Sequence, residues 1–183
     1  METKILIVLA PGFEEIEALG TADILRRLSF PVTLAALGND KIVPGSHQIN
    51  VTADTRLSEI DPTEFSVVVL PGGMPGARHL RDSADLRQIL QSFAAAGKIV
   101  AAICAAPIAL GAAGLLTDRR YTVYPGFERE IPGGIHTGNR VEADGNIITG
   151  NGPGAVFEFA TRIAAALDKA GESEELLDQM MYQ

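Results

Sequence analysis

Short runs of consecutive apolar residues alternate along the chain with longer segments whose apolar residues recur every three or four positions. The runs are Ile5 to Ala10, Val32 to Leu37, Val67 to Leu70, Ile99 to Ile103, Tyr121 to Tyr124 and Ile147 to Thr149. Such runs are typical of buried parallel strands, and the periodic segments of helices with one apolar face. Those helical segments are Glu14 to Ser29, a stripe from Leu86 to Phe93, Ala105 to Ala113, a helix beginning near Pro153, and Glu172 to Met181. Residues 38–62 carry turn signals and predict a small hairpin.

Strands that alternate with helices predict an α/β fold, with a mostly parallel central sheet covered by helices on both faces. The length of 183 residues suits one domain spanning 1–183. Ligands in such sheets bind beyond the carboxyl ends of the strands. The residues that directly follow each strand are therefore the candidates for function.

Composition excludes several classes of protein. One cysteine rules out an internal disulfide, and no paired Cys/His spacing predicts a metal site. A formal net charge of −8 argues against nucleic acid or an anionic membrane as a partner. No apolar stretch reaches the ~18 residues of a transmembrane helix. With no export signal at the N-terminus, we expect a cytoplasmic protein.

Cys104 lies where a predicted strand runs into a predicted helix, among small alanines. A thiol at a helix N-terminus feels the positive end of the helix dipole, which can lower its pKa and produce a nucleophilic thiolate. A buried structural cysteine is the alternative, and the cysteine alone slightly favours it. The glycines of Pro71-Gly72-Gly73 free the backbone to turn an N–H toward such a site, where it and the amide of Ala105 would stabilise an oxyanion. A plain strand-to-helix turn is the alternative for this tripeptide.

Glu14, Glu15 and Glu17 crowd the first helical turns after the first strand. Favourable charge at a helix N-terminus explains Glu14 and Glu15. Glu17 lies at the edge of the apolar face, where a carboxyl that faces inward would be partly desolvated, would have a raised pKa and could act as a general acid and base. The residues alone favour the helix-charge interpretation over this one. His47, His79 and His136 are not beside the cysteine in sequence, and we interpret them by default as surface or structural residues.

Four segments together resemble the ThiJ/PfpI superfamily, and most of all its parkinsonism-associated deglycase branch, the DJ-one-like proteins. They are residues 11–17, 67–73, 99–107 and 152–160, in the same order and with compatible spacing. The resemblance implies a flavodoxin-like three-layer sandwich and a homodimer. It implies that Cys104 is the reactive cysteine, that Glu17 is its protonated partner, and that the amides of Gly73 and Ala105 line the pocket, with Gly72 and Pro153 near the substrate.

The chain departs from the pattern of some relatives. Tyr124 stands where those relatives carry a histidine near the cysteine, so Glu17 has to carry the proton transfer. Ala105 stands where the protease branch has a histidine directly after the cysteine, which argues against proteolysis. His136-Thr137-Gly138 does not supply the His-x-Glu of glutamine amidotransferases.

Two functions from different classes follow. The first is a cofactor-independent glyoxalase or deglycase, in which the Cys104 thiolate adds to a small aldehyde such as methylglyoxal, or to a glycated substrate. The second is a redox sensor or stress-protective chaperone whose cysteine is oxidised to the sulfinate. A role in thiamine-thiazole metabolism ranks below both, since no phosphate-binding loop is present.

Overall fold

A seven-stranded sheet forms the centre of the molecule. The computed structural model describes residues 3–182. The strand order is β10-β11-β7-β6-β1-β2-β5, and every neighbouring pair is parallel except β10 and β11. The strands are β1 (Ile5–Leu9), β2 (Val32–Ala36), β5 (Thr55–Arg56), β6 (Val67–Leu70), β7 (Ile99–Ile103), β10 (Val141–Asp144) and β11 (Ile147–Gly150). Two small sheets lie outside it, β3 (Ile42–Pro44) with β4 (Asn50–Thr52), and β8 (Arg120–Tyr121) with β9 (Ile135–His136).

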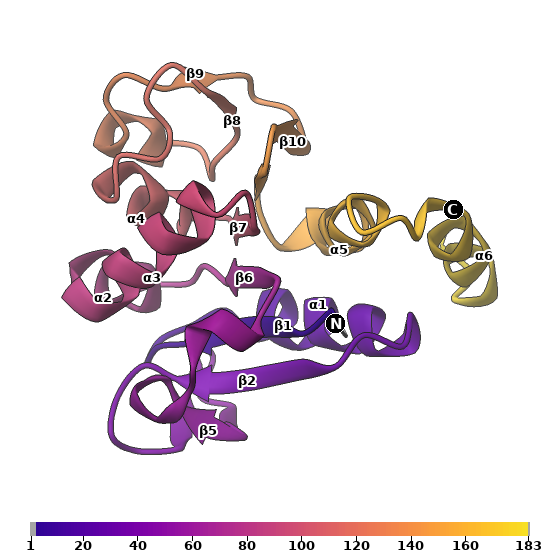
Figure 1. The fold of residues 1–183 in the computed structure, drawn as a ribbon, viewed down its shortest axis with the longest axis horizontal. Coiled ribbons are helices and arrows are strands. Elements are labelled where there is room, and N and C mark those ends of the chain that lie inside the picture. The colour runs from indigo at the N-terminus through magenta and orange to yellow at the C-terminus, as the bar shows by residue number, and fades with distance from the viewer. Residues whose placement is uncertain (1–2, 183) are drawn as a thin grey trace.

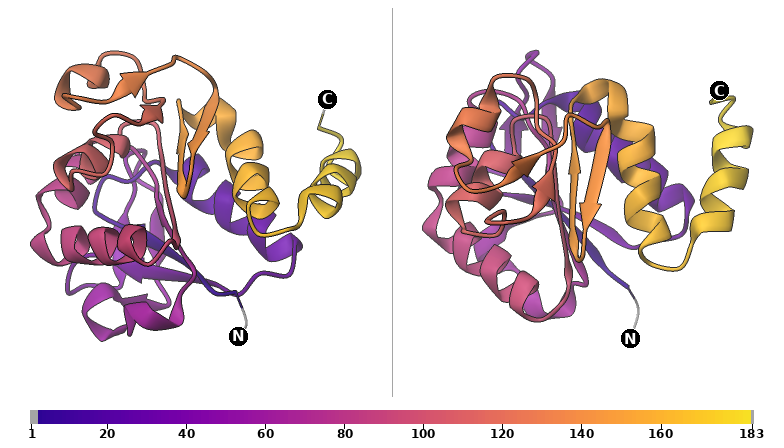
Figure 2. Two further views of the ribbon diagram at one scale, coloured as in Figure 1. Left: turned by 45° about the horizontal axis from the view of Figure 1, so that its top comes forward. Right: turned by 90° about the horizontal axis from the view of Figure 1, so that it is seen from above.

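Helices cover both faces of this sheet. On one side lie α2 (Gly76–Asp82), α3 (Ala84–Ala95) and α4 (Pro107–Ala112); on the other lie α1 (Glu15–Arg27) and α5 (Val156–Ala165), with α6 (Ala170–Gln179) beyond α5 (Figures 1 and 2). Short 3-10 turns span Leu57–Glu59, Pro62–Glu64, Phe127–Glu130 and Pro153–Ala155. This confirms the predicted flavodoxin-like sandwich with a mostly parallel sheet.

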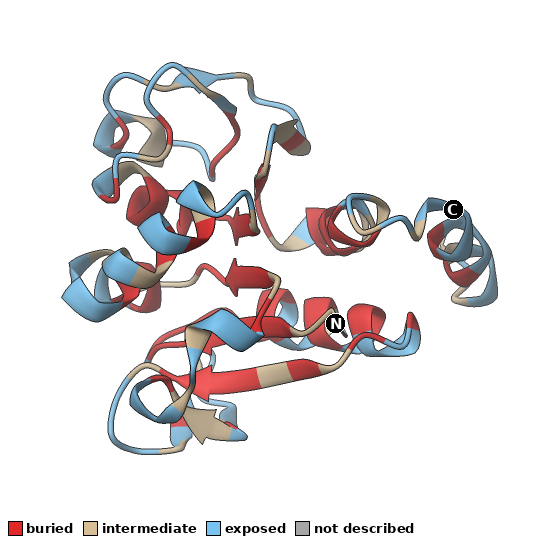
Figure 3. Cartoon of the chain, in the orientation of Figure 1, coloured by how far each residue is buried: buried red, intermediate tan, exposed pale blue. Residues whose placement is uncertain are grey.

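The core lies between the sheet and its two helical layers. Every residue of β1, β6 and β7 is buried, because helices lie on both faces of these strands (Figure 3). That is why their sequences are continuous apolar runs rather than alternating ones. The outer helix faces are polar and exposed, and α6 buries only Ser173 and Leu176. Within the described residues, no helix is long and apolar enough to span a membrane.

Several elements differ from the sequence-based expectation. The run from Tyr121 to Tyr124 is not a strand of the main sheet: the N–H of Thr122 donates to Oγ1 of Thr149, and that of Tyr124 to the carbonyl of Cys104. The side chains of Tyr121 and Val123 are instead buried in the core, whereas that of Tyr124 is 46% exposed. The helix after Cys104 begins at Pro107 rather than at residue 105. Helix α2 and strand β10 were not predicted, because neither carries an apolar stripe or run of its own.

Candidate active site

Cys104 occupies a sharp turn at the carboxyl end of β7. Its φ is 62°, in the left-handed region that residues with a side chain seldom adopt. The turn is fixed from both sides, because its N–H donates to the carbonyl of Gly150 and its carbonyl accepts from the N–H of Tyr124, both at 2.9 Å. Such strain, held by its surroundings, is typical of functional positions. The same device exposes the nucleophile of strand-to-helix elbows in hydrolases.

Glu17 reaches the same point from the first turn of α1. Glu14 caps this helix by accepting the N–H of Glu17 at 2.7 Å, which fixes where the helix begins. The Glu17 side chain is 1% exposed, and its Oε2 accepts the N–H of Gly72 at 2.7 Å. Its Oε1 is also buried and has no nitrogen or oxygen partner among the described residues. The Cys104 thiol is the polar group that couples to this carboxyl.

The glycine pair after β6 brings the two groups together. Gly72 accepts the N–H of Glu14 through its carbonyl and donates its own N–H to Glu17, so it ties the start of α1 to this loop. A Cβ at Gly72 would lie 2.6 Å from the Cβ of Cys104 and 2.8 Å from Oε2 of Glu17. Gly73 has a φ of +88°, and a Cβ there would collide with the backbone of residues 12–14. Only glycine fits either position.

Two amides face the sulfur. The backbone N–H groups of Gly73 and Ala105 both hydrogen-bond Cys104. They converge from different loops, as an oxyanion-binding pair would. Gly72, expected near the substrate, instead gives its N–H to Glu17 and is buried, so that amide is not free for a ligand.

Burial governs the protonation of the pair. It raises the pKa of Glu17 to about 7, although hydrogen bonds from Cys104 and Gly72 act in the opposite direction. Burial, followed by the negative charge of Glu17, raises the pKa of Cys104 to about 12, against the amides of Gly73 and Ala105. The expectation that a position at a helix N-terminus is enough to lower the pKa of Cys104 is therefore wrong while Glu17 is ionised. Helix α4 starts three residues after the sulfur and is only six residues long. A thiolate is favoured when Glu17 takes up the proton, because the opposing charge then disappears and a donor replaces it.

An open pocket of about 510 Å³ leads to the sulfur. Cys104 is 9% exposed at this pocket. The lining side chains are Glu14, Glu15, Ile16, His47, Ile49, Cys104, Tyr124 and Pro153. The structure thus places Pro153 and Tyr124 beside Cys104 in the pocket, whereas Glu17 is buried and does not line it. The volume falls in the range of small-molecule sites.

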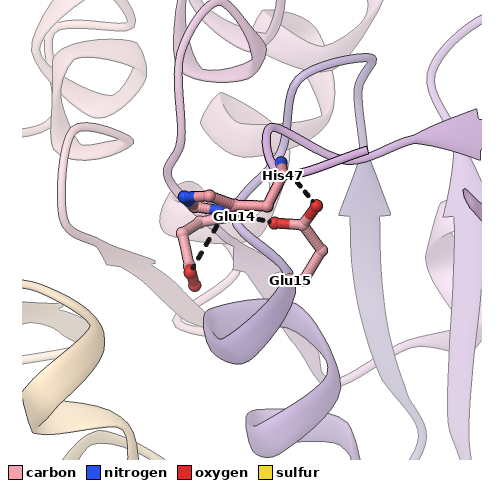
Figure 4. Close-up of side chains that lie close together, drawn as sticks. All are labelled: Glu14, Glu15 and His47. Carbon is pink, nitrogen blue, oxygen red and sulfur yellow. Dashed lines mark hydrogen bonds and ion pairs between the residues drawn. The ribbon is translucent and has the colours of Figure 1, made fainter. Parts of the chain in front are cut away.

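One wall of the pocket is the tip of the β3–β4 hairpin, which Glu15 holds in place. The N–H of His47 donates to Oε1 of Glu15 at 2.7 Å, and Nδ1 of His47 lies 2.8 Å from Oε2 (Figure 4). The N–H of Ile49 and the hydroxyl of Ser46 also donate to this carboxylate, at 3.4 and 3.2 Å. Burial opposes ionisation of Glu15, but these hydrogen bonds, led by the one from His47, outweigh it and lower its pKa to about 2.

The three histidines have different surroundings. His79 is exposed and contacts the carbonyl of Pro11 through Nδ1, and His136 packs its ring against Tyr121. Neither belongs to the residues lining the Cys104 pocket, but His47 does. Sequence reasoning missed it, because only the folded hairpin brings residue 47 to residue 15. Glu14, Glu15 and His47 hold ligand atoms within 4.8 Å of one another, but hydrogen bonds already engage both oxygens of Glu15, and we assign no metal there.

Comparison with known protein families identifies a match over most of the chain. The model of the DJ-1/PfpI family matches residues 3–166. The chain belongs to the DJ-1/PfpI family. It is 37% identical to the protein dj-1beta of Drosophila melanogaster over 169 residues, which cover 91% of this chain and 90% of that protein. It is 30% identical to the glutathione-independent glyoxalase DJR-1.2 of Caenorhabditis elegans, over 94% of this chain and 92% of that protein.

Solved structures of the DJ-1/PfpI family have the same fold. The crystal structure of Drosophila melanogaster DJ-1beta superposes with a TM-score of 0.95 at 34% identity and covers all of both chains. A structure of Toxoplasma gondii DJ-1 described as oxidized superposes with a TM-score of 0.93 at 35% identity, covering 98% of each chain. These likenesses extend across the whole sandwich rather than to the sheet alone.

Proposed function

We propose that the chain is a cofactor-independent glyoxalase or deglycase that acts on reactive carbonyls such as methylglyoxal. One observation carries this proposal: the Cys104 thiol and the buried Glu17 carboxyl are coupled, with the amides of Gly73 and Ala105 on the same sulfur. The family includes a glutathione-independent glyoxalase, which adds support.

The reaction begins when the thiol adds to the aldehyde carbon. The S–H proton passes to Glu17, the sulfur bonds to the carbon, and the carbonyl oxygen becomes an oxyanion facing the amides of Gly73 and Ala105. Glu17 returns this proton to the oxygen, which gives a hemithioacetal and leaves Glu17 ionised. Glu17 then removes the proton from the former aldehyde carbon and delivers one to the neighbouring carbon, through an enediol. The product is a thioester of lactate on Cys104, and water releases lactate and the free thiol.

The pocket has room for more than the smallest substrates. One water occupies roughly 30 Å³ in the liquid, so about 510 Å³ holds methylglyoxal together with several waters. A carbonyl adduct on a longer amino-acid side chain also fits. We therefore include glycated amines and thiols among the substrates, and free methylglyoxal is the simplest probe.

The test is D-lactate formation from methylglyoxal without glutathione. Cys104→Ala and Glu17→Gln should each lower turnover by at least about 100-fold, since general acid–base catalysis alone is worth that much. Glu175→Gln is the matched control, because it removes an exposed carboxylate of α6 far from the pocket. If Cys104→Ala and Glu17→Gln both keep wild-type turnover, the proposal is wrong.

Oxidation sensing is the second candidate. The Toxoplasma gondii relative has been observed in an oxidized form, and a protonated Glu17 would donate a hydrogen bond to a sulfinate on Cys104. No second cysteine exists to form an intramolecular disulfide. Mass spectrometry after mild peroxide distinguishes the two functions: stable addition of two oxygens to Cys104, with negligible aldehyde turnover, favours sensing.

A further inference from the structure

The Cys104 pocket contains an acid–base group that the chemistry of Cys104 and Glu17 leaves unused. His47 lines the pocket, and its side chain is 68% exposed, so its ring is open to water and to ligands. Its partner Glu15 is held rigidly, with a side chain only 6% exposed. A histidine oriented by a buried carboxylate is the usual arrangement of a general base in nucleophilic catalysis.

The carboxylate fixes which ring nitrogen is free. Glu15 is ionised, so its oxygens only accept hydrogen bonds. Nδ1 of His47, 2.8 Å from Oε2 of Glu15, must therefore carry a proton. In the neutral ring the lone pair is then on Nε2, the nitrogen that makes no contact with Glu15 (Figure 4). Nε2 is thus available to take a proton from water in the pocket.

We propose that His47, oriented by Glu15, is the catalytic base that activates water to hydrolyse the Cys104 thioester. This inference rests on the proposed function, and it assigns the one step for which Glu17 is poorly placed. Glu17 is 1% exposed and does not line the pocket, whereas His47 stands in the open pocket through which water arrives. Glu17 is the proton carrier for the carbon centres, and His47 is the base for the incoming water.

The step balances without any further reactant. Nε2 takes a proton from water as the water oxygen bonds to the thioester carbon, and the resulting oxyanion faces the amides of Gly73 and Ala105. The carbon–sulfur bond then breaks. The sulfur leaves with the bonding electrons and receives the proton from Nε2, directly or through a water. Lactic acid departs, and the thiol and the neutral imidazole are restored.

The charges around His47 strengthen it as a base. The hydrogen bond and the charge of Glu15 raise the pKa of His47, and the charge of Glu14 adds to this. Oε1 of Glu14 lies 4.0 Å from Nδ1, and the hydroxyl of Ser46 lies 3.1 Å from it. Loss of the Glu15 charge should therefore move the titration of His47 to lower pH.

The experiment uses p-nitrophenyl acetate, which acylates a reactive cysteine without any proton transfer between carbons. Wild type should give a burst of nitrophenol followed by slower turnover limited by hydrolysis of the acetyl thioester. His47→Gln should keep the burst and lower the steady rate roughly 100-fold. Glu15→Gln should shift the acidic limb of the steady rate to lower pH. His136→Gln is the matched control, since that histidine lies outside the pocket.

With methylglyoxal, His47→Gln should accumulate an adduct on Cys104 that survives denaturation and is released by hydroxylamine as a hydroxamate. If His47 has only a structural role, its replacement should raise KM or lower stability. The acidic limb of the pH profile and the steady rate of acyl-thioester hydrolysis would then stay unchanged, and that outcome overturns the proposal. The proposed function fails differently, because wild type would then give neither burst nor lactate. If His47→Gln gives the burst and then hydrolyses the acetyl thioester at the wild-type rate, His47 is not the base, whereas the proposed function is unaffected.

Discussion

The backbone N–H of Gly72 lies 2.7 Å from Oε2 of Glu17, and this contact decides which carboxyl oxygen can carry a proton. An oxygen that accepts from an N–H is the carbonyl oxygen of a neutral carboxyl group, so the proton resides on Oε1. Oε1 is the buried atom without a nitrogen or oxygen partner. The loop that positions Glu17 thus leaves its acidic proton on the oxygen available to the Cys104 sulfur and to a group bonded to that sulfur.

The first prediction concerns stability against pH. Burial raises the pKa of Glu17 from 4.5 to about 7, so between these values the folded state holds a proton that the unfolded chain has lost. The free energy of unfolding therefore falls as pH rises from about 4.5 to about 7, by up to about 3 kcal/mol. Glu17→Gln removes this dependence. Urea unfolding should show the variant more stable than wild type at pH 8, by about 1–3 kcal/mol, and little different at pH 4.

Glu175→Gln, an exposed carboxylate on α6, serves as the comparison and should show no such gain. Cys104→Ala removes a hydrogen bond that lowers the pKa of Glu17, so its stability should fall more steeply over the same pH range. If the difference between Glu17→Gln and wild type is the same at pH 4 and at pH 8, Glu17 does not hold a raised pKa.

A second prediction follows from the space around Gly72. An alanine there would place its Cβ 2.6 Å from the Cβ of Cys104, a separation that Cβ contacts do not tolerate. Gly72→Ala should therefore displace the sulfur from Glu17 and lower aldehyde turnover by about 100-fold or more. Gly38→Ala is the control, because nothing lies within 4 Å of its added Cβ. Equal turnover in the two variants would mean that the site tolerates this displacement.

Tyr124 supplies the third prediction. Its ring lines the pocket beside Cys104, and its N–H fixes the carbonyl of Cys104. If the ring acts as an apolar wall, Tyr124→Phe should retain kcat and KM, and Tyr124→Ala should raise KM about tenfold, which corresponds to about 1.4 kcal/mol of lost binding. Steady-state kinetics with methylglyoxal decides this. A large fall of kcat in Tyr124→Phe would instead give the hydroxyl a chemical role.

The resemblance to the ThiJ/PfpI superfamily paired Cys104 with Glu17, and the positions of the parallel strand ends explain why the two segments meet. Strands β1 and β7 flank β6, so the segments after all three meet at one edge of the sheet. The role of His47 could not be found in this way. Its place depends on how the hairpin docks, through the N–H of Gly12 on Pro44 and that of Ser46 on Phe13, which no local pattern encodes.

The protonation of Cys104 was also beyond the sequence. Helix placement argues for a lowered pKa, but desolvation and the charge of Glu17 dominate once the fold is formed. Both depend on how completely residues distant in the sequence enclose the sulfur. The prediction of a main-sheet strand at Tyr121 to Tyr124 was wrong for a related reason. Tyr121 pairs with β9 outside the main sheet, and the amides of Thr122 and Tyr124 bond a side chain and a turn.

The last prediction concerns the proposed homodimer. Leu19 on α1 and Ile42 on the hairpin are large apolar side chains that are 37% and 53% exposed. They lie on α1 and on the β3–β4 hairpin, the two elements that contribute Ile16 and Ile49 to the pocket wall, and association of two copies through these elements would bury them. Leu19→Glu and Ile42→Glu should then shift sedimentation from dimer to monomer, since an unpaired charge at a buried interface is strongly unfavourable. Ile135→Glu, at an equally exposed isoleucine of β9, should not. If the wild type is a monomer, or if none of the three substitutions dissociates the dimer, the surface of α1 and the hairpin is not the dimer interface.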